Sequence, residues 1–181
     1  MRLALLLLTL LTPLSPTMAA ETVFPPTAPG VAEFKTLPAG MLLKSSGKGS
    51  YFDEANGLFR PLFSYISAHQ IAMTTPVEAR IDRAAMYFWV APSEQAKVTG
   101  NSPGVEVINL PERRVASLGA RGGYSRENFE QTRAALLAWL AKQPGVEAAG
   151  EPYAVYWNSP FTLWFVKRSE VHVPVRPRVA K

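Results

Sequence analysis

The chain has 181 residues, of which 48% are hydrophobic, so it is long enough and apolar enough to bury the core of one ordinary domain. Its formal net charge is only +5, and the basic residues are dispersed along the chain. It contains no cysteine, which excludes disulfide bonds and every site that depends on a thiolate.

The first twenty residues have the layout of a secretory signal peptide. Arg2 supplies a positive start, residues 3–11 form a leucine-rich run, and the stretch ends in Ala19 and Ala20. The apolar run is about half of the ~20 residues needed to span a bilayer, so we expect cleavage after one of these alanines rather than a stable membrane anchor. The mature protein is then exported, either periplasmic or secreted. Nucleic acid is not an expected partner of an exported protein with dispersed basic residues.

The first half of the mature chain predicts four strands and one helix. Residues 21–30 contain three prolines and are expected to form an extended leader before a domain over residues 31–175. Apolar residues from Phe52 to Ile66 recur at spacings of three, four and seven, which is typical of a helix with one face on a sheet. The uniformly apolar residues 86–90 indicate a strand that is buried on both faces. The predicted elements are strands over 31–37 and 41–48, a helix over 52–67, and strands over 71–81 and 85–90.

The second half repeats this order. Ser125 is a good residue to begin a helix, four apolar residues after it form a stripe, and Pro144-Gly145 ends it. The predicted elements are strands over 105–110 and 113–120, a helix from Ser125, and strands over 153–157 and 162–173, followed by a basic tail over 176–181. Two strand-strand-helix-strand-strand repeats predict an α+β fold. Its eight antiparallel strands would curl into a distorted barrel with two helices.

Several motifs resemble those of the SOUL family of heme-binding proteins. They occur in the family's order: F-R-P-L-F-S-Y-I at residues 59–66, I-A-M-T-T-P-V at 71–77, N-S-P-F at 158–161 and K-R-S-E-V at 167–171. The resemblance extends from about Glu33 to Val173, and the I-A-M-T-T-P-V segment is matched in full. The last motif departs from the family pattern, with Lys167 and Ser169 in place of an arginine and an asparagine. The fold implied by the resemblance is the same two-repeat barrel.

The resemblance implies a heme b cofactor or a related tetrapyrrole, bound without a covalent bond because there is no cysteine. The heme contacts of the family on its first helix match Phe59 and Phe63. These two residues lie one helical turn apart, so they can form a continuous apolar patch for a flat macrocycle, although both also belong to the stripe that packs on the sheet. Ser64 stands where the family often has a basic residue. Arg60, Lys167 and Arg168 are then the candidate partners of the heme propionates.

Only two histidines are candidates for iron ligation. His69 lies in the connection before the I-A-M-T-T-P-V segment, where a loop could place its imidazole over a porphyrin held on the helix. His172 lies in the predicted final strand. The resemblance assigns the axial ligand to neither, and His69 is our candidate for the metal site.

Three other interpretations remain open at this stage. The barrel could bind another amphipathic small molecule beside Tyr87, Trp89 and Trp157. It could be a hydrolase of small apolar molecules with Glu78 or Glu170 as the base, although no G-x-S-x-G or H-E-x-x-H motif is present. It could also be an interaction module without a ligand. We expect a monomeric binding protein that buffers or transports its ligand, rather than an enzyme.

Overall fold

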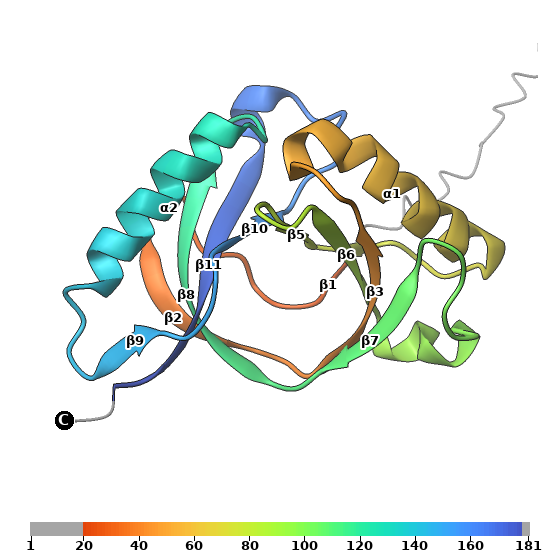
Figure 1. The fold of residues 1–181 in the computed structure, drawn as a ribbon, viewed down its shortest axis with the longest axis horizontal. Coiled ribbons are helices and arrows are strands. Elements are labelled where there is room, and N and C mark those ends of the chain that lie inside the picture. The colour runs from red at the N-terminus through yellow and green to blue at the C-terminus, as the bar shows by residue number, and fades with distance from the viewer. Residues whose placement is uncertain (1–19, 179–181) are drawn as a thin grey trace, which may run out of the picture.

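A computed structural model describes residues 20–178 (Figure 1). Residues 1–19 of the predicted signal peptide and the last three residues of the basic tail lie outside the described residues. The helices are α1 (Tyr51–Ala68) and α2 (Arg126–Leu140), with the 3-10 helices η1 (Pro92–Lys97) and η2 (Trp164–Val166). The strands are β1 (Glu21–Thr22), β2 (Ala32–Leu37), β3 (Gly40–Ser46), β4 (Thr74–Thr75), β5 (Val77–Arg80), β6 (Ala85–Val90), β7 (Glu106–Leu110), β8 (Arg113–Arg121), β9 (Val146–Ala148), β10 (Tyr153–Tyr156) and β11 (Arg168–Pro177).

Eight strands form one curled antiparallel sheet in the order β2-β8-β11-β10-β5-β6-β3-β7, and β9 extends it beside β11. The order is symmetric about the pair of β10 and β5, which come from different repeats. The opening strand of each repeat lies beside the other repeat, because β2 pairs with β8 and β7 pairs with β3. The predicted α+β fold of two repeats is therefore confirmed. The sheet has the form of a half-barrel, since β2 and β7 do not pair with each other within the described residues.

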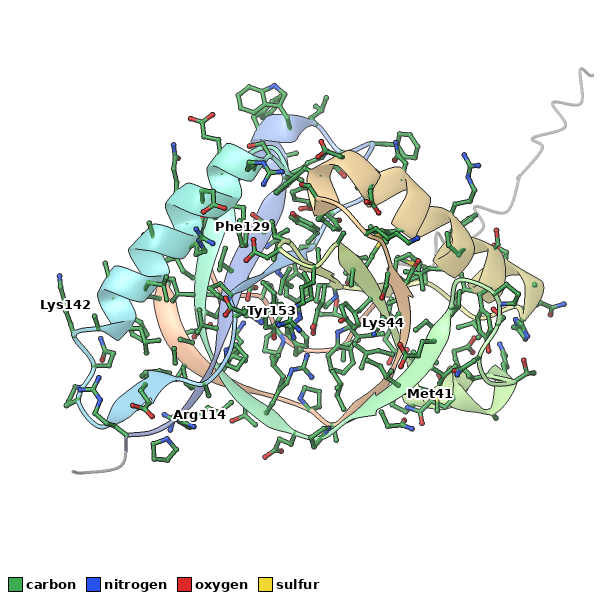
Figure 2. All side chains as sticks on the ribbon, viewed as in Figure 1. Met41, Lys44, Arg114, Phe129, Lys142 and Tyr153 are labelled. Atoms are coloured by element: carbon green, nitrogen blue, oxygen red, sulfur yellow. The ribbon has the colours of Figure 1, made fainter. Side chains whose placement is uncertain are left out.

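The sheet separates two apolar layers. Both helices cover its outer face, and the side chain of Phe129 from α2 lies between that helix and the sheet, whereas Tyr153 lies inside the curl (Figures 1 and 2). Strand β6 contributes side chains to both layers, since Phe88 packs in the layer under the helices and Trp89 packs in the inner layer. This alternation confirms the prediction that residues 86–90 are buried on both faces.

Residues 21–30, the predicted leader, are packed into the domain. Strand β1 pairs in parallel with β4, and Phe24 is 5% exposed in the inner layer. Further along, the leader backbone lies directly on β8. A Cβ atom at Gly119 would lie only 2.4 Å from the carbonyl oxygen of Ala28, so this position accepts glycine alone. The folded unit therefore begins about ten residues before the predicted boundary at residue 31, at β1.

The last strand begins later than predicted. The chain over residues 162–167 is not a strand: it contains η2, and β11 begins only at Arg168. Arg168 pairs with Arg121, which is the last residue of β8, so no neighbouring strand extends far enough to pair with the residues before Arg168. At its other end β11 continues to Pro177 beside β9, an unpredicted strand, so the tail begins later than expected. Within the described residues no helix is long and apolar enough to cross a membrane.

Candidate functional site

Helix α1 presents two different flanks beside its buried face. Tyr51, Leu58, Leu62, Tyr65 and Ile66 are buried. At about 100° per residue, Phe52, Phe59 and Phe63 share one flank of the helix. The guanidinium of Arg126 lies 5.0 Å from the ring of Phe52, so this flank faces the beginning of α2.

The opposite flank of α1 faces the loop before β7. The hydroxyl of Tyr65 donates to the carbonyl of Gly100 at 2.9 Å, and a Cβ atom at Gly104 would touch Pro61. That flank is therefore covered by protein, and the flank with the phenylalanines is the one available to a ligand.

Phe59 and Phe63 form a stacked pair on this flank. Their ring centroids are 5.5 Å apart and their planes differ by 16°. Phe59 packs edge-on against Phe88 of the core, with centroids 5.4 Å apart. Phe63 is 51% exposed. Phe59, the inner ring, therefore holds Phe63 in place, and Phe63, the outer ring, presents a flat apolar face to solvent.

The predicted cationic residues come from two separate elements. Arg60 lies on the solvent side of α1 and forms no hydrogen bond or ion pair within residues 20–178. Lys167, in the connection between β10 and β11, donates to the carbonyl of Pro160 at 2.8 Å. Arg168 is exposed at the start of β11. No hydrogen bond or cation–π contact joins these two residues to the phenylalanine pair in the described chain.

Three tyrosines link this connection to α1. The Nζ atom of Lys167 lies 5.0 Å from the ring of Tyr124, which packs against Tyr156 at 4.2 Å, and Tyr156 lies 6.0 Å from Tyr51 at the start of α1. Burial raises the pKa of Tyr124 to about 12, and it raises the pKa of Tyr51 and that of Tyr156 well above their usual range. The tyrosines therefore form a neutral aromatic floor between the beginnings of the two α-helices.

His69 lies at the C-terminal end of α1, with both ring nitrogens hydrogen-bonded. Nδ1 lies 2.9 Å from the carbonyl oxygen of Tyr65, and Nε2 lies 2.8 Å from the hydroxyl of Thr99. The imidazole also stacks on the ring of Tyr65, with centroids 4.2 Å apart. The contact with Thr99 places His69 on the covered flank, away from Phe63. Iron ligation by Nε2 therefore requires the loss of its contact with Thr99.

A buried polar cluster lies inside the curl. It contains Glu170 and Trp157, which the sequence analysis names separately as a possible base and a possible pocket residue, and it adds Lys35 and Ser117, which were not predicted. Glu170 accepts hydrogen bonds from the indole of Trp157 at 2.7 Å and the hydroxyl of Ser117 at 2.8 Å, and it pairs with Lys35 at 3.2 Å. His172 Nε2 lies 2.6 Å from the same carboxylate. Burial by itself would raise the pKa of Glu170, but the hydrogen bond with His172 and the charge of Lys35 lower it to about 2. Burial lowers the pKa of His172.

The other buried carboxylate has a similar environment. Glu78 accepts the indole N–H of Trp89 at 3.1 Å and a guanidinium N–H of Arg113 at 2.6 Å. Phe24 lies edge-on to both tryptophans and separates them. A sequence signal for this cluster exists, because each acid lies in a strand between apolar or small residues, and a buried acid requires a partner. The sequence does not show which partners the fold supplies.

The structure also contains a cavity of about 550 Å³ away from the phenylalanine pair. It lies at the end of the hairpin of β5 and β6, and its polar lining residues are Lys44, Ser46, Arg80, Asp82, Arg83 and Glu151. Tyr87 also lines it, and Tyr87 packs against the inner layer. The cavity combines five charged side chains with an apolar part of the lining, which suits a small amphipathic molecule with a charged group.

Comparison with solved structures supports the fold. The crystal structure of the EcmrR C-terminal domain is similar with a TM-score of 0.64 at 13% identity, covering 82% of this chain and 98% of that domain. In the cryo-EM structure of an EcmrR–DNA complex, the match covers 82% of this chain and 58% of that one, with a TM-score of 0.65 at 13% identity. A hydrolase from Listeria innocua matches with a TM-score of 0.55 at 14% identity, covering 82% of this chain and 94% of that one. At these identities the likeness shows the fold alone.

Comparison by sequence identifies the family. No curated protein sequence matches the chain. The family described as SOUL heme-binding protein matches residues 27–174, which is most of the chain and includes both α-helices and the curled sheet up to residue 174 of its last strand, β11. The motifs on α1, β4 and β5, and the start of β11 lie within this match. The chain belongs to the SOUL heme-binding protein family.

Proposed function

We propose that this protein binds heme b, without a covalent bond, on the exposed flank of α1, and that it buffers or transports heme outside the cytoplasm. The observation that carries the proposal is the stacked pair of Phe59 and Phe63, whose outer ring is 51% exposed. Family membership supports heme or tetrapyrrole binding in general. The site on α1 and the choice of heme b are our own inferences.

The residues present fit the group. A porphyrin is flat and apolar at its centre, and Phe63 offers a flat apolar ring that the core holds in place through Phe59. Its propionates are anionic, and Arg60 is an exposed cation one helical turn or less from both phenylalanines. Lys167 is the second candidate, because the tyrosine floor connects its position to α1. When bound, heme would supply a redox-active iron, and this chain would supply stacking and charge neutralisation.

Export is part of the proposal and rests on the N-terminal sequence. The charged start, leucine-rich run and small residues at positions 19 and 20 are typical of a secretory signal peptide. Detection of the mature chain in the periplasm or medium, with its N-terminus at residue 20 or 21, tests this part.

Hemin titration tests the site. The purified protein is expected to give a saturable shift of the Soret band, and Phe63→Asp to weaken binding about tenfold or more, because a carboxylate replaces the stacking ring and repels the propionates. Leu137→Asp is the matched control. Leu137 is an exposed apolar residue of α2, at 39%, so this change adds the same charge to the other helix.

Two results would contradict the proposal. The absence of a saturable shift at micromolar hemin would remove heme as the ligand. Equal weakening by Phe63→Asp and Leu137→Asp would remove the α1 flank as the site and leave heme binding elsewhere in the molecule. Circular dichroism of both variants establishes that the fold is intact.

The cavity of about 550 Å³ supports a second candidate, an amphipathic small molecule with a polar head. Its cationic residues would bind an anionic head, and Tyr87 would contact an aromatic body at the border of the inner layer. Native mass spectrometry of the protein as purified tests this candidate. A bound small molecule that is lost in Arg80→Gln and retained in Phe63→Asp would support it.

A further inference from the structure

The connection between β10 and β11 exposes more apolar surface than any other part of the described chain. Five of the eight large exposed hydrophobic residues lie in six consecutive positions. They are Phe161 at 95%, Leu163 at 63%, Trp164 at 69%, Phe165 at 53% and Val166 at 42%. We refer to these five residues as the apolar tip. An exposed cluster of this kind on a soluble domain marks an interaction surface.

The tip is held in one conformation by hydrogen bonds at its base. Thr162 and Val166 donate their backbone N–H groups within the connection, at 3.0 and 3.1 Å, and the second bond forms part of η2. Asn158 accepts the backbone N–H of Arg168 at 2.7 Å. The hydroxyl of Tyr124 accepts the N–H of Asn158 at 2.8 Å and donates to the carbonyl of Arg168 at 3.0 Å. The apolar side chains are therefore presented outward on an ordered frame, which lowers the entropic cost of binding.

Cations surround the base of the tip. Lys167 and Arg168 follow it directly, and Arg121 is the register partner of Arg168 on β8. Arg126 begins α2, where its guanidinium binds the hydroxyl of Ser50. Within residues 20–178 none of these four cations forms an ion pair with a carboxylate.

The nearest acids of α2 do not neutralise this charge. Glu127 accepts a hydrogen bond from Gln131 at 3.3 Å, and Glu130 pairs with Arg133 at 2.5 Å. The first turn of α2 therefore leaves the cations at the base of the tip without a counter-charge from the protein. An anionic partner would supply it.

We propose that the apolar tip docks the protein reversibly on an anionic lipid bilayer. Tryptophan and phenylalanine side chains insert at the boundary between headgroups and acyl chains, and cations beside them bind anionic headgroups. The tip supplies both features within eight consecutive residues, 161–168, and η2 lies at the outer edge of the molecule, where a flat surface can approach it (Figure 1). The proposal does not depend on heme binding.

Vesicle flotation tests the proposal. The chain from Glu21 is used, because the structure shows that residues 21–178 contain both apolar layers and the complete sheet, and because residues 1–20 would themselves bind lipid. It is mixed at low salt with vesicles of phosphatidylcholine alone or of equal parts phosphatidylcholine and phosphatidylglycerol. We expect flotation with the phosphatidylglycerol vesicles, reduced by added salt. We also expect a blue shift in tryptophan emission from Trp164, which is exposed, whereas Trp89 and Trp157 are buried and Trp139 is half-buried.

Variants connect flotation to the tip. Trp164→Glu and Phe161→Glu are each expected to weaken partitioning about tenfold or more, whereas Trp164→Phe keeps most of it. Leu137→Glu is the control, since it places the same charge on an exposed apolar residue outside the tip. Arg121→Gln with Arg168→Gln is expected to remove most of the preference for phosphatidylglycerol.

Three outcomes would overturn the proposal. The first is that the protein fails to float with phosphatidylglycerol vesicles at low salt. The second is that Trp164→Glu and Leu137→Glu float equally well. The third is that the protein does not float but forms a dimer in sedimentation velocity, and that Trp164→Glu abolishes the dimer. The tip would then bind a second copy of the chain.

Discussion

Glu170 accepts the indole N–H of Trp157 at 2.7 Å inside the curl, with the side chain of Glu170 fully buried. Two other strands also contact this carboxylate, since Ser117 comes from β8 and Lys35 from β2. The leader adds the backbone N–H of Thr27 at 2.6 Å. One carboxylate thus joins three strands and the leader, and its ionisation is coupled to the stability of the domain.

The first prediction concerns the pH dependence of stability. The pKa of Glu170 is lowered to about 2 in the folded protein, below the 4.5 of an ordinary glutamate, so its contribution is complete above about pH 4.5 and is lost as the pH falls towards 2. That contribution is of the order of 3 kcal/mol. The lowered pKa of His172 acts in the same direction below pH 6.5. Urea unfolding of Glu170→Gln should therefore show a loss at pH 7 that shrinks at pH 3.

Glu147→Gln is the control for this experiment. Glu147 pairs with Arg176 on the surface, where the arginine side chain is 65% exposed, so its loss is expected to cost less than about 1 kcal/mol at any pH. Equal stability of the two variants at pH 7, or a difference that does not change with pH, would contradict the assigned role of Glu170.

The second prediction is that the leader belongs to the core. Phe24 packs between Trp89 and Trp157, with ring centroids 5.8 and 5.4 Å apart, and is 5% exposed. Phe24→Ala should lower the free energy of unfolding by about 3–5 kcal/mol and shift the tryptophan emission to the red. Val31→Ala, at a position that is 46% exposed, should cost less than about 1 kcal/mol. A Phe24→Ala variant as stable as the wild type would show that the leader is dispensable.

The packing of the leader and the start of the last strand could not be predicted from the sequence, because both depend on distant parts of the chain. Three prolines predict an extended leader, but the burial of Phe24 depends on tryptophans more than sixty residues away, which local composition does not reveal. Residues 161–166 have the aromatic and β-branched composition of a strand, yet pairing requires a neighbour, and β8 ends at Arg121. The repeat itself was predictable because the periodicities of strands and helices are local properties.

The candidate site was predictable only in part. The spacing of Phe59 and Phe63 places both on one flank of α1, as expected. Which ring faces the core depends on the exact angle at which the helix lies on β3 and β6, so the exposure of Phe63 required the structure. The hydrogen bonds of His69 depend on Thr99, thirty residues away in a loop without regular periodicity.

The third prediction concerns the buried ion pair of Glu78 and Arg113. Glu78→Gln leaves a buried guanidinium without its counter-charge, and the Nε and Nη1 atoms of Arg113 already lack hydrogen-bond partners in the described chain. We expect a loss of about 3–5 kcal/mol. Combining it with Arg113→Met should recover most of this loss, because neither charge remains. Chemical denaturation of both variants tests this.

The exposed ion pair of Lys44 and Glu106 is the control for these two variants. Glu106→Gln breaks an ion pair of 2.8 Å in which the glutamate is 53% exposed, and should cost less than about 1 kcal/mol. A double variant at positions 78 and 113 that is less stable than Glu78→Gln alone would contradict the prediction. It would show that the pair stabilises the fold by more than the mutual neutralisation of two buried charges.

The fourth prediction tests His69 as the iron ligand of the proposed heme, a role that requires the imidazole to leave Thr99 and Tyr65 and turn from the covered flank of α1 towards Phe63. Ligation through Nε2 competes with the contact of 2.8 Å between this nitrogen and Thr99, so Thr99→Val should strengthen hemin binding. A hydrogen bond contributes about 0.5–1.5 kcal/mol, which corresponds to a roughly two- to tenfold increase in affinity. His69→Ala should weaken binding and change the ferric EPR spectrum, because the imidazole leaves the iron. Thr36→Val, at an exposed threonine of β2, should change neither quantity. A His69→Ala complex with the wild-type EPR spectrum would remove His69 from the iron, and the stacking face of Phe63 would then have to hold the macrocycle without it.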